Sequence, residues 1–181
     1  KQEIADIAGL TPGDTIFFIA DREAQAALYA GQIRTELGNR LDLIEKNSYR
    51  FCYINDFPMY EYDNEEKKYI FTHNPFSMPQ GGLEALNTKE PSEILAYQYD
   101  IVCNGIELSS GAVRNHDLDI MVKAFEIAGY TEEDLKEKFG ALYNAFQFGA
   151  PPHAGMAPGV DRMIMLLRNE ENIREIIPFP I

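Results

Sequence analysis

The chain has 181 residues, of which 45% are hydrophobic and 12% aromatic, so it can bury a core in one or two domains. Its net charge of −13 argues against a domain whose main work is to grip a phosphate backbone, although it leaves room for a local basic pocket. No apolar run approaches the roughly 18 residues of a membrane span, and the first residues lack the apolar region of a signal peptide.

Residues 1–45 are predicted to form the closing half of a small α+β unit. A helix that ends at Gly9 is followed by turn residues and then by a strand of buried type at 15–20. A second helix comes next, with Asp21 as its expected N-cap and apolar residues at helical spacing. The chain lacks an initiator Met and stops abruptly, which indicates a piece excised from a longer protein.

Residues 46–181 are predicted to form an antiparallel sheet flanked by helices, so the fold class is α+β. The expected elements are, in chain order, a hairpin over 51–74, a loop at 75–82, a weak helix at 83–96, strands at 97–108 and 111–116, and helices at 117–129, 131–149 and about 160–167. Gly105 and residues 109–111 are expected bends, and Asp117 and Thr131 are expected helix caps.

Cysteine usage favours a cytoplasmic protein. Cys52 and Cys103 both lie in apolar, strand-like stretches, which is typical of free buried thiols and suits a reducing cytosol. With three histidines and no Cys-x-x-Cys pair, the sequence predicts no structural zinc site.

Two side chains are candidates for contacting a small ligand. His73 lies where a strand gives way to a proline-rich loop, a place that presents side chains, although an ordinary strand-end histidine is an alternative. Arg114 could bind a carboxylate in bidentate fashion, and its alternative is a salt bridge to Asp117 or Asp119.

Two carboxylates indicate a candidate cation site. Asp100 and Glu107 lie in otherwise apolar, strand-like sequence, where an unpaired buried acid is costly. If they converge, they could hold Mg²⁺, particularly when substrate phosphates complete its shell. The alternative is that both are solvated on an exposed face of the sheet.

The stretch GAPPHAGMAPGVDR at 149–162 precedes an apolar helix and suits an anion. Gly155 and Gly159 let the backbone lie against a ligand. A helix that starts near Val160 aims free N–H groups at the same place, and Arg162 adds a fixed planar cation. The alternative is an ordinary connection into a core helix with Arg162 on its surface.

These motifs together resemble a known family. The segment GMAPGVDR followed by MIMLL is similar to motif 3 of the class II aminoacyl-tRNA synthetases. DFPMYEYD, THNPFSMP, YDIVCNGIELSSGAVR and FGAPPHAGMAPGVDRMIMLL, in that order, resemble the catalytic domain of bacterial-type aspartyl-tRNA synthetases. The match covers nearly all of 51–180, and residues 1–45 are similar to the end of the insertion domain that interrupts this catalytic domain.

The resemblance implies roles for the candidate residues. Arg114 would bind the β-carboxylate of aspartate, His73 would lie in a loop that closes on the amino acid, and Gly155 would line the floor of the site. Glu107 with Asp100 would hold Mg²⁺ on the ATP phosphates. The ATP contacts would come from Glu107 and from four consecutive residues, Gly159, Val160, Asp161 and Arg162.

The implied reaction is ATP-dependent formation of aspartyl-adenylate, followed by transfer to tRNA(Asp). The resemblance further implies a homodimer for the whole enzyme. The lack of a long apolar run predicts no membrane contact. Motifs 1 and 2 and an anticodon-binding barrel are not recognisable here, so the fragment alone is expected to be inactive. Asn74 stands where many members carry a second histidine, which leaves open the discrimination of tRNA(Asp) from tRNA(Asn).

Two other functions remain compatible with the sequence. A related class II synthetase for asparagine or lysine would share the fold, but Arg114 favours an acidic substrate side chain. A non-catalytic, synthetase-like binding module would fit the acidic charge and the incomplete site.

Overall fold

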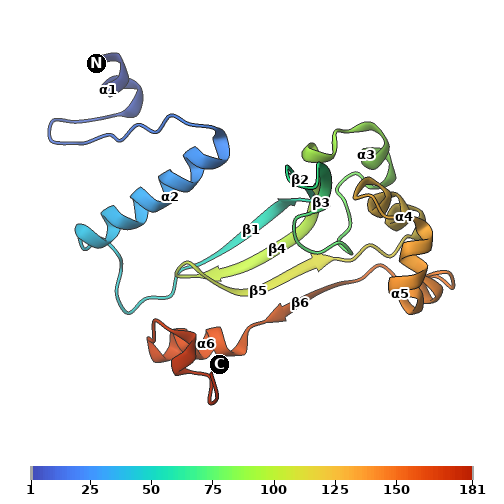
Figure 1. Cartoon of the computed structure of the whole chain (residues 1–181). Coiled ribbons are helices and arrows are strands. Elements are labelled where there is room, and N and C mark those ends of the chain that lie inside the picture. The colour runs from blue at the N-terminus through green and yellow to red at the C-terminus, as the bar shows by residue number, and fades with distance from the viewer. Residues whose placement is uncertain (1, 181) are drawn as a thin grey trace. The chain divides into compact units, whose positions relative to one another are not determined.

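The computed structural model describes residues 2–180, which divide into two compact units between Ser48 and Tyr49 (Figure 1). The assignment of the first unit to an insertion domain stays a prediction. The elements follow in chain order: α1 (Gln2–Ala8), α2 (Glu23–Arg40), β1 (Phe51–Pro58), β2 (Tyr60–Asp63), β3 (Lys68–Phe71), α3 (Gly82–Thr88), β4 (Leu95–Cys103), β5 (Ile106–Val113), α4 (Leu118–Ile127), α5 (Glu132–Phe146), β6 (Ala154–Pro158) and α6 (Val160–Arg168), with short 3₁₀ helices at Pro91–Glu93 and Ile173–Glu175.

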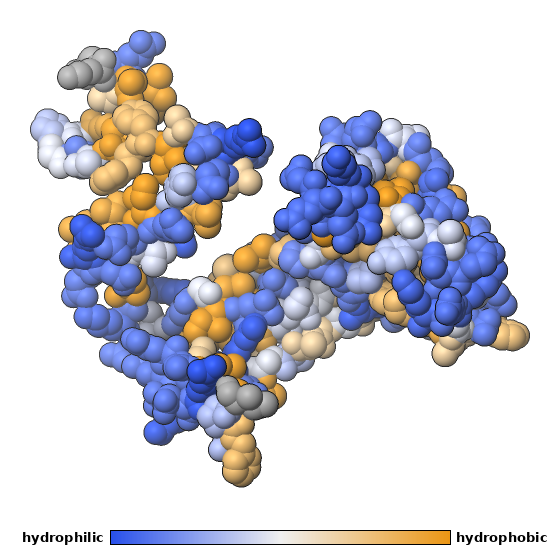
Figure 2. All heavy atoms as spheres, in the orientation of Figure 1, coloured by the Kyte–Doolittle hydropathy of each residue, from blue (hydrophilic) through white to orange (hydrophobic). Residues whose placement is uncertain are grey.

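The first unit contains two helices but not the predicted strand. Residues 15–20 are extended without forming a ladder, and Phe18 is 71% exposed. The strand prediction was wrong because a strand needs a hydrogen-bonded neighbour, and no described residue pairs with this segment. Apolar residues therefore gather on the surface of this unit (Figure 2).

The cap predicted for α2 is also corrected. Arg22 occupies the N-cap position and makes no side-chain cap hydrogen bond. Asp21 instead accepts a hydrogen bond from the Arg22 backbone N–H at 2.7 Å, one residue before the helix begins. Gly9, by contrast, follows α1 with a φ of +65°, as expected of a glycine that ends a helix.

The second unit is built on an antiparallel sheet with the strand order β1-β4-β5-β6, and the α+β fold is confirmed. The expected hairpin forms between β2 and β3, but β1 leaves it and pairs with β4. Cys52 is exposed rather than buried, because nearly every residue of β1 is exposed among the described residues. Cys103 is buried, and both thiols are free as predicted.

Residues 109–111, which were expected to bend, are part of the continuous strand β5. The turn lies earlier, at Asn104 and Gly105, where φ is +52° and +81°. Gly111 is required in this segment for a different reason, namely a close approach of a side chain and a carbonyl to its Cα. A Cβ on Gly111 would lie 2.4 Å from Cε2 of Tyr99 and 2.7 Å from the carbonyl oxygen of Gly155.

The helices of the second unit pack on two clusters of buried residues. One joins β2, β4 and α3 to α4, and the other joins α4 to α5 through aromatic side chains such as Phe125 and Phe76. Both predicted caps are confirmed. The backbone N–H and hydroxyl of Thr131 both donate to Asp134 and hold the pKa of this carboxyl below its ordinary value.

Helix α6 is less buried than its apolar sequence suggested. Val160 and Leu167 are 62% and 70% exposed, whereas Met165 is buried. The apolar sequence therefore does not make α6 a core helix: it packs on β5 and on the 3₁₀ helix at Ile173–Glu175, and Met165 is its one buried residue.

Replacing Asp117 by Ala is expected to lower the free energy of unfolding of the second unit by about 1 kcal/mol. The Asp117 carboxylate accepts hydrogen bonds from Asp119 N and Ile120 N at 2.9 and 3.1 Å, and α4 contributes to both buried clusters. Urea unfolding followed by circular dichroism measures the change. Asp117→Asn keeps the acceptor and should behave as the unchanged chain; an equal loss with Asn would contradict the capping explanation.

Candidate functional site

Strands β5 and β6 place two of the predicted residues on one face of the sheet. Gly155 pairs with Ala112, and cross-strand partners point to the same face. Arg114 follows Ala112 at the next same-face position, just after β5 ends. The two residues come together because the backbone N–H of Arg114 donates to the carbonyl of His153 at 2.9 Å, which ties β6 to β5.

A pocket of about 280 Å³ opens at this end of the sheet. Its lining comes from the loop after β3, the residues just after β5, helix α5 and the start of β6, and consists of Phe76, Arg114, Asn115, Leu142, Phe146, His153, Ala154 and Gly155. A Cβ on Gly155 would meet no atom within 4 Å, so the glycine leaves open space rather than relieving a clash. The lining is thus mostly apolar, with one permanent cation.

The Arg114 side chain makes no hydrogen bond or ion pair with any residue in the described part of the chain. The alternative salt bridge to Asp117 or Asp119 is not formed; Asp117 instead caps α4. A guanidinium beside an apolar pocket and without a protein partner is suited to binding an anionic group of a ligand.

The two predicted acids lie further along the same face. Asp100 pairs with Ser110, two positions before Ala112, and Glu107 pairs with Val102, two positions after Asp100. A register shift between Ile101 and Val102 adds one extra residue to β5, so Glu107 shares the face of Asp100 although it is an odd number of positions from Ala112. The acids are therefore diagonal neighbours, whose Cα atoms are typically about 7–8 Å apart. Among residues 2–180 no group of three or more Asp, Glu, His or Cys side chains could hold a metal by itself. Two carboxylates at this spacing fit a cation that also takes oxygens from phosphates and water.

Arg162 is positioned by the connection from β6 to α6. The backbone N–H of Gly159 donates to the carbonyl of Leu108 at 2.7 Å, so α6 begins beside the start of β5. Nη1 of Arg162 lies 2.8 Å from the carbonyl oxygen of Glu107 and 3.0 Å from its Oε1. Val160 and Asp161, in the same first turn, are exposed.

The predicted residues thus form two groups at opposite ends of one strand. Arg114 and Gly155 lie at one end of β5, whereas Glu107 and Arg162 lie at the other. Because the register shift uses one of the seven positions from Glu107 to Arg114, the stretch spans about 20 Å, a length suited to a long, polyanionic ligand. The pocket at Arg114 is not lined by Asp100, Glu107 or Arg162.

His73 is exposed, as expected for a side chain presented by a loop. Its ring contacts Phe57 edge to face, with centroids 4.9 Å apart. The residues after it are tied to the sheet by several hydrogen bonds, including one from Gln80 Nε2 to Asp56 Oδ1 at 2.6 Å. Sequence reasoning missed the side chains around Arg114, such as His153, because they meet it only through long-range pairing.

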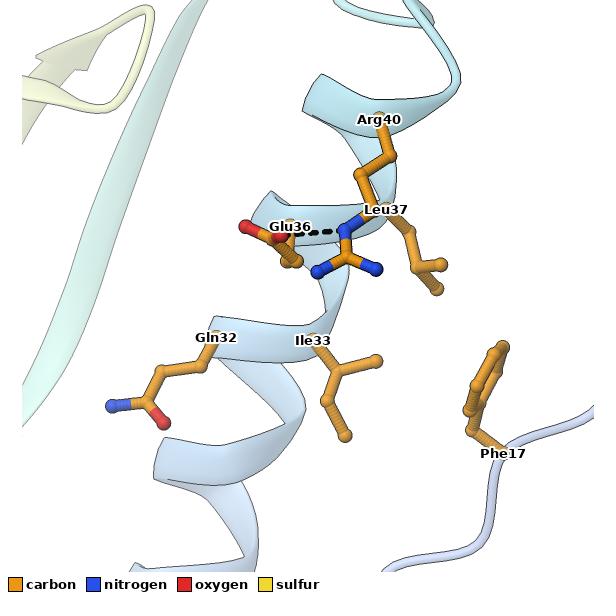
Figure 3. A pocket seen from close by; sticks show the side chains of 6 residues that line it. All are labelled: Phe17, Gln32, Ile33, Glu36, Leu37 and Arg40. Carbon is orange, nitrogen blue, oxygen red and sulfur yellow. Dashed lines mark hydrogen bonds and ion pairs between the residues drawn. The ribbon is translucent and has the colours of Figure 1, made fainter.

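A second hollow of about 490 Å³ lies in the first unit and is lined by none of the predicted site residues. In Figure 3, Phe17 from the extended segment lies opposite Ile33 and Leu37 of α2, and Arg40 donates to Glu36. This hollow is larger than the pocket at Arg114, but it carries no unpaired charged group. It reflects the partly covered apolar face of α2 rather than a site for chemistry.

These features belong to a known protein family. The family described as tRNA synthetases class II (D, K and N) matches residues 14–181. The chain belongs to this family. The resemblance to bacterial aspartyl-tRNA synthetases is confirmed by relatives with high identity across nearly the whole chain.

Among curated class II synthetases, the aspartate–tRNA(Asp/Asn) ligase of Ehrlichia chaffeensis is 62% identical over 98% of this chain and 30% of its own length. The ligase of the same name from Zymomonas mobilis is 63% identical with the same coverage. The chain therefore spans about 30% of the length of these relatives.

Solved structures of class II synthetases show the same fold. An Entamoeba histolytica aspartyl-tRNA synthetase matches 99% of this chain and 30% of its own, with a TM-score of 0.53 at 22% identity. A Pyrococcus horikoshii asparaginyl-tRNA synthetase matches 99% and 34%, with a TM-score of 0.51 at 17% identity. None of the helices within residues 2–180 is both long and apolar enough to cross a membrane.

Proposed function

We propose that this chain is part of an aspartate–tRNA ligase, which activates L-aspartate with ATP and transfers it to tRNA. The observation that carries the proposal is the identity of more than 60% with such ligases over 98% of the chain, which includes every candidate residue. The unpaired guanidinium of Arg114 supports it, because aspartate is the amino acid of this family (D, K and N) whose side chain is an anion.

The pocket at Arg114 is proposed to take the amino acid. The guanidinium would bind the β-carboxylate with two parallel hydrogen bonds, which fixes orientation as well as charge. Gly155 would leave the floor open for the substrate, and His73 would lie beside the amino acid. Asparagine or lysine would present a neutral amide or a cation to Arg114, so neither suits this pocket.

The other end of the same face is proposed to bind ATP. Arg162 and the free N–H groups of the first turn of α6, from Val160 onward, would contact the nucleotide, with Gly159 allowing close approach. Asp100 and Glu107 would hold Mg²⁺, which when bound neutralises charge on the phosphates. Because Arg162 now contacts Glu107, we expect this contact to loosen when ATP brings its own negative charge.

The chemical step is an in-line attack at the α-phosphorus of ATP. A carboxylate oxygen of aspartate bonds to this phosphorus, the bond to the bridging oxygen breaks, and pyrophosphate leaves with the electron pair. The residues named here would act by holding the two substrates in line, which lowers the entropy cost of reaction. Arg162 would also offset the charge that develops on pyrophosphate.

We further propose that the whole enzyme charges both tRNA(Asp) and tRNA(Asn) with aspartate, because both relatives carry both tRNAs in their names. A cytoplasmic homodimer is the assembly that we propose for it from the family resemblance. Light scattering of the whole enzyme measures the oligomeric state.

The test is a chimera in which this chain replaces the matching segment of the Zymomonas mobilis ligase. We expect aspartate-dependent exchange between ATP and pyrophosphate, followed by charging of tRNA(Asp) and tRNA(Asn) transcripts. A chimera that folds and binds neither aspartate nor ATP would favour the alternative of a non-catalytic binding module. Charging of tRNA(Asp) alone would contradict the broader tRNA specificity.

The 181-residue chain alone is expected to catalyse no exchange, because it spans about 30% of the length of its relatives. Parallel exchange assays of chain and chimera measure this directly. Turnover by the chain alone that equals turnover by the chimera would show that the site is complete without the remaining segments.

A further inference from the structure

The segment that follows His73 is built into the sheet. Strands β4 and β5 pair as far as Gln98 and Ala112, and beyond that point residues 77–79 lie between them. Ser77 forms a bridge to Arg114. Met78, in the middle of the segment, donates a backbone hydrogen bond to β5 and accepts one from β4. The backbone beside Arg114 is therefore held by this segment as well as by β6.

A buried glutamine fastens this segment to β4. Gln98 is 6% exposed, and its side-chain Nε2 donates to the carbonyl of Asn74 at 3.2 Å and to Oγ of Ser77 at 2.9 Å. Ser77 is fully buried. Both amide hydrogens are thus used on one loop, in surroundings where hydrogen bonds are stronger than in water.

Asn74 shapes the same loop from within. Its Oδ1 accepts from the backbone N–H of Phe76 at 2.9 Å, and its carbonyl accepts from the backbone N–H of Ser77 at 3.2 Å. A hydrogen bond from a backbone N–H to the side-chain oxygen of an asparagine two residues earlier defines an Asx turn. The Asn74 oxygen is therefore used inside the turn that directly follows His73.

We propose that Gln98 is a positioning residue for the amino-acid pocket, with Asn74 as its partner. Gln98 holds the turn at 74–77 against β4, and so sets where His73 and the backbone beside Arg114 stand before substrate arrives. Residues 74–80 form a fixed wall of the pocket. The loop that the resemblance implies to close on the amino acid therefore does not include them. This inference rests on the proposed function, because the pocket's ligand is taken to be aspartate.

The test compares Gln98→Met with the unchanged chimeric ligase in the pyrophosphate-exchange assay. Methionine keeps the length of the side chain but donates no hydrogen bond. We expect KM for aspartate to rise about 30-fold, the effect of losing two hydrogen bonds of ordinary strength. KM for ATP should not change, because Glu107 and Arg162 lie at the other end of β5. Gln32→Met, on exposed α2, is the matched control.

Substitutions of Asn74 give an independent test that leaves the buried amide of Gln98 in place. Asn74→Ala removes the turn acceptor and should raise KM for aspartate, whereas Asn74→Asp keeps an oxygen there and should restore it. If Gln98→Met does not fold, the Asn74 pair decides the question. An unchanged KM for aspartate, or equal changes in the KM values for aspartate and ATP, overturns the positioning role. If the chimera without these substitutions shows no aspartate-dependent pyrophosphate exchange, the proposed function is overturned instead.

Discussion

Replacing Arg114 by leucine in the chimeric ligase is expected to lower kcat/KM for aspartate about 10³-fold. Two hydrogen bonds from a guanidinium to a carboxylate each contribute roughly 1.5–3 kcal/mol, and 1.4 kcal/mol corresponds to a factor of ten. The effect should be this large because no described residue competes for Arg114, so all of its binding capacity is available to the substrate. Pyrophosphate exchange at varied aspartate concentration measures it.

Two further variants separate charge from geometry. Arg114→Lys keeps the charge but loses the planar fork, so we expect it to recover only part of the activity. Arg168→Leu removes a cation from the last turn of α6, where the side chain is exposed, and should leave aspartate kinetics unchanged. Unchanged aspartate kinetics in Arg114→Leu would show that this arginine does not contact the substrate side chain, and would reopen the alternative amino acids.

Features set by near neighbours in the chain were predictable from the sequence. The caps at Asp117 and Thr131 and the turn at Gly105 each depend on residues no more than three positions away. Features set by strand pairing were not. Residues 15–20 have strand composition without a strand partner, and residues 109–111 were predicted as a bend although Tyr99, on the neighbouring strand, is what requires Gly111.

The candidate site divides in the same way. Its residue types could be named from the motifs, because Arg114, Glu107 and Arg162 stand out by chemistry within apolar sequence. Which of these side chains are paired could not be predicted. The contact of Arg162 with Glu107 spans 55 positions, and the guanidinium of Arg114 is unpaired because Asp117 caps α4. Gln98 gave no signal at all, because a glutamine in a strand is ordinarily a solvated residue.

Replacing Gly155 by valine is expected to lower kcat/KM for aspartate about 100-fold while leaving the melting temperature of the chimera unchanged. Gly155 lines the pocket of about 280 Å³, and a Cβ there would point into open space. Added methyl groups would therefore fill room that the substrate needs, without displacing protein atoms. A misplacement of the substrate by about 1 Å is enough for a loss of this size.

Gly111→Ala is the matched control for this prediction, because it adds a Cβ to the neighbouring strand. That Cβ would lie 2.4 Å from the Tyr99 ring and 2.7 Å from the Gly155 carbonyl, so the strand must shift and stability should fall by about 1–3 kcal/mol. Thermal unfolding and exchange kinetics together separate the two glycines. Gly155 should affect activity without stability, and Gly111 should affect stability first. If Gly155→Val instead destabilises the protein and spares aspartate KM in the folded fraction, the open space at Gly155 belongs to packing with other segments and not to the substrate.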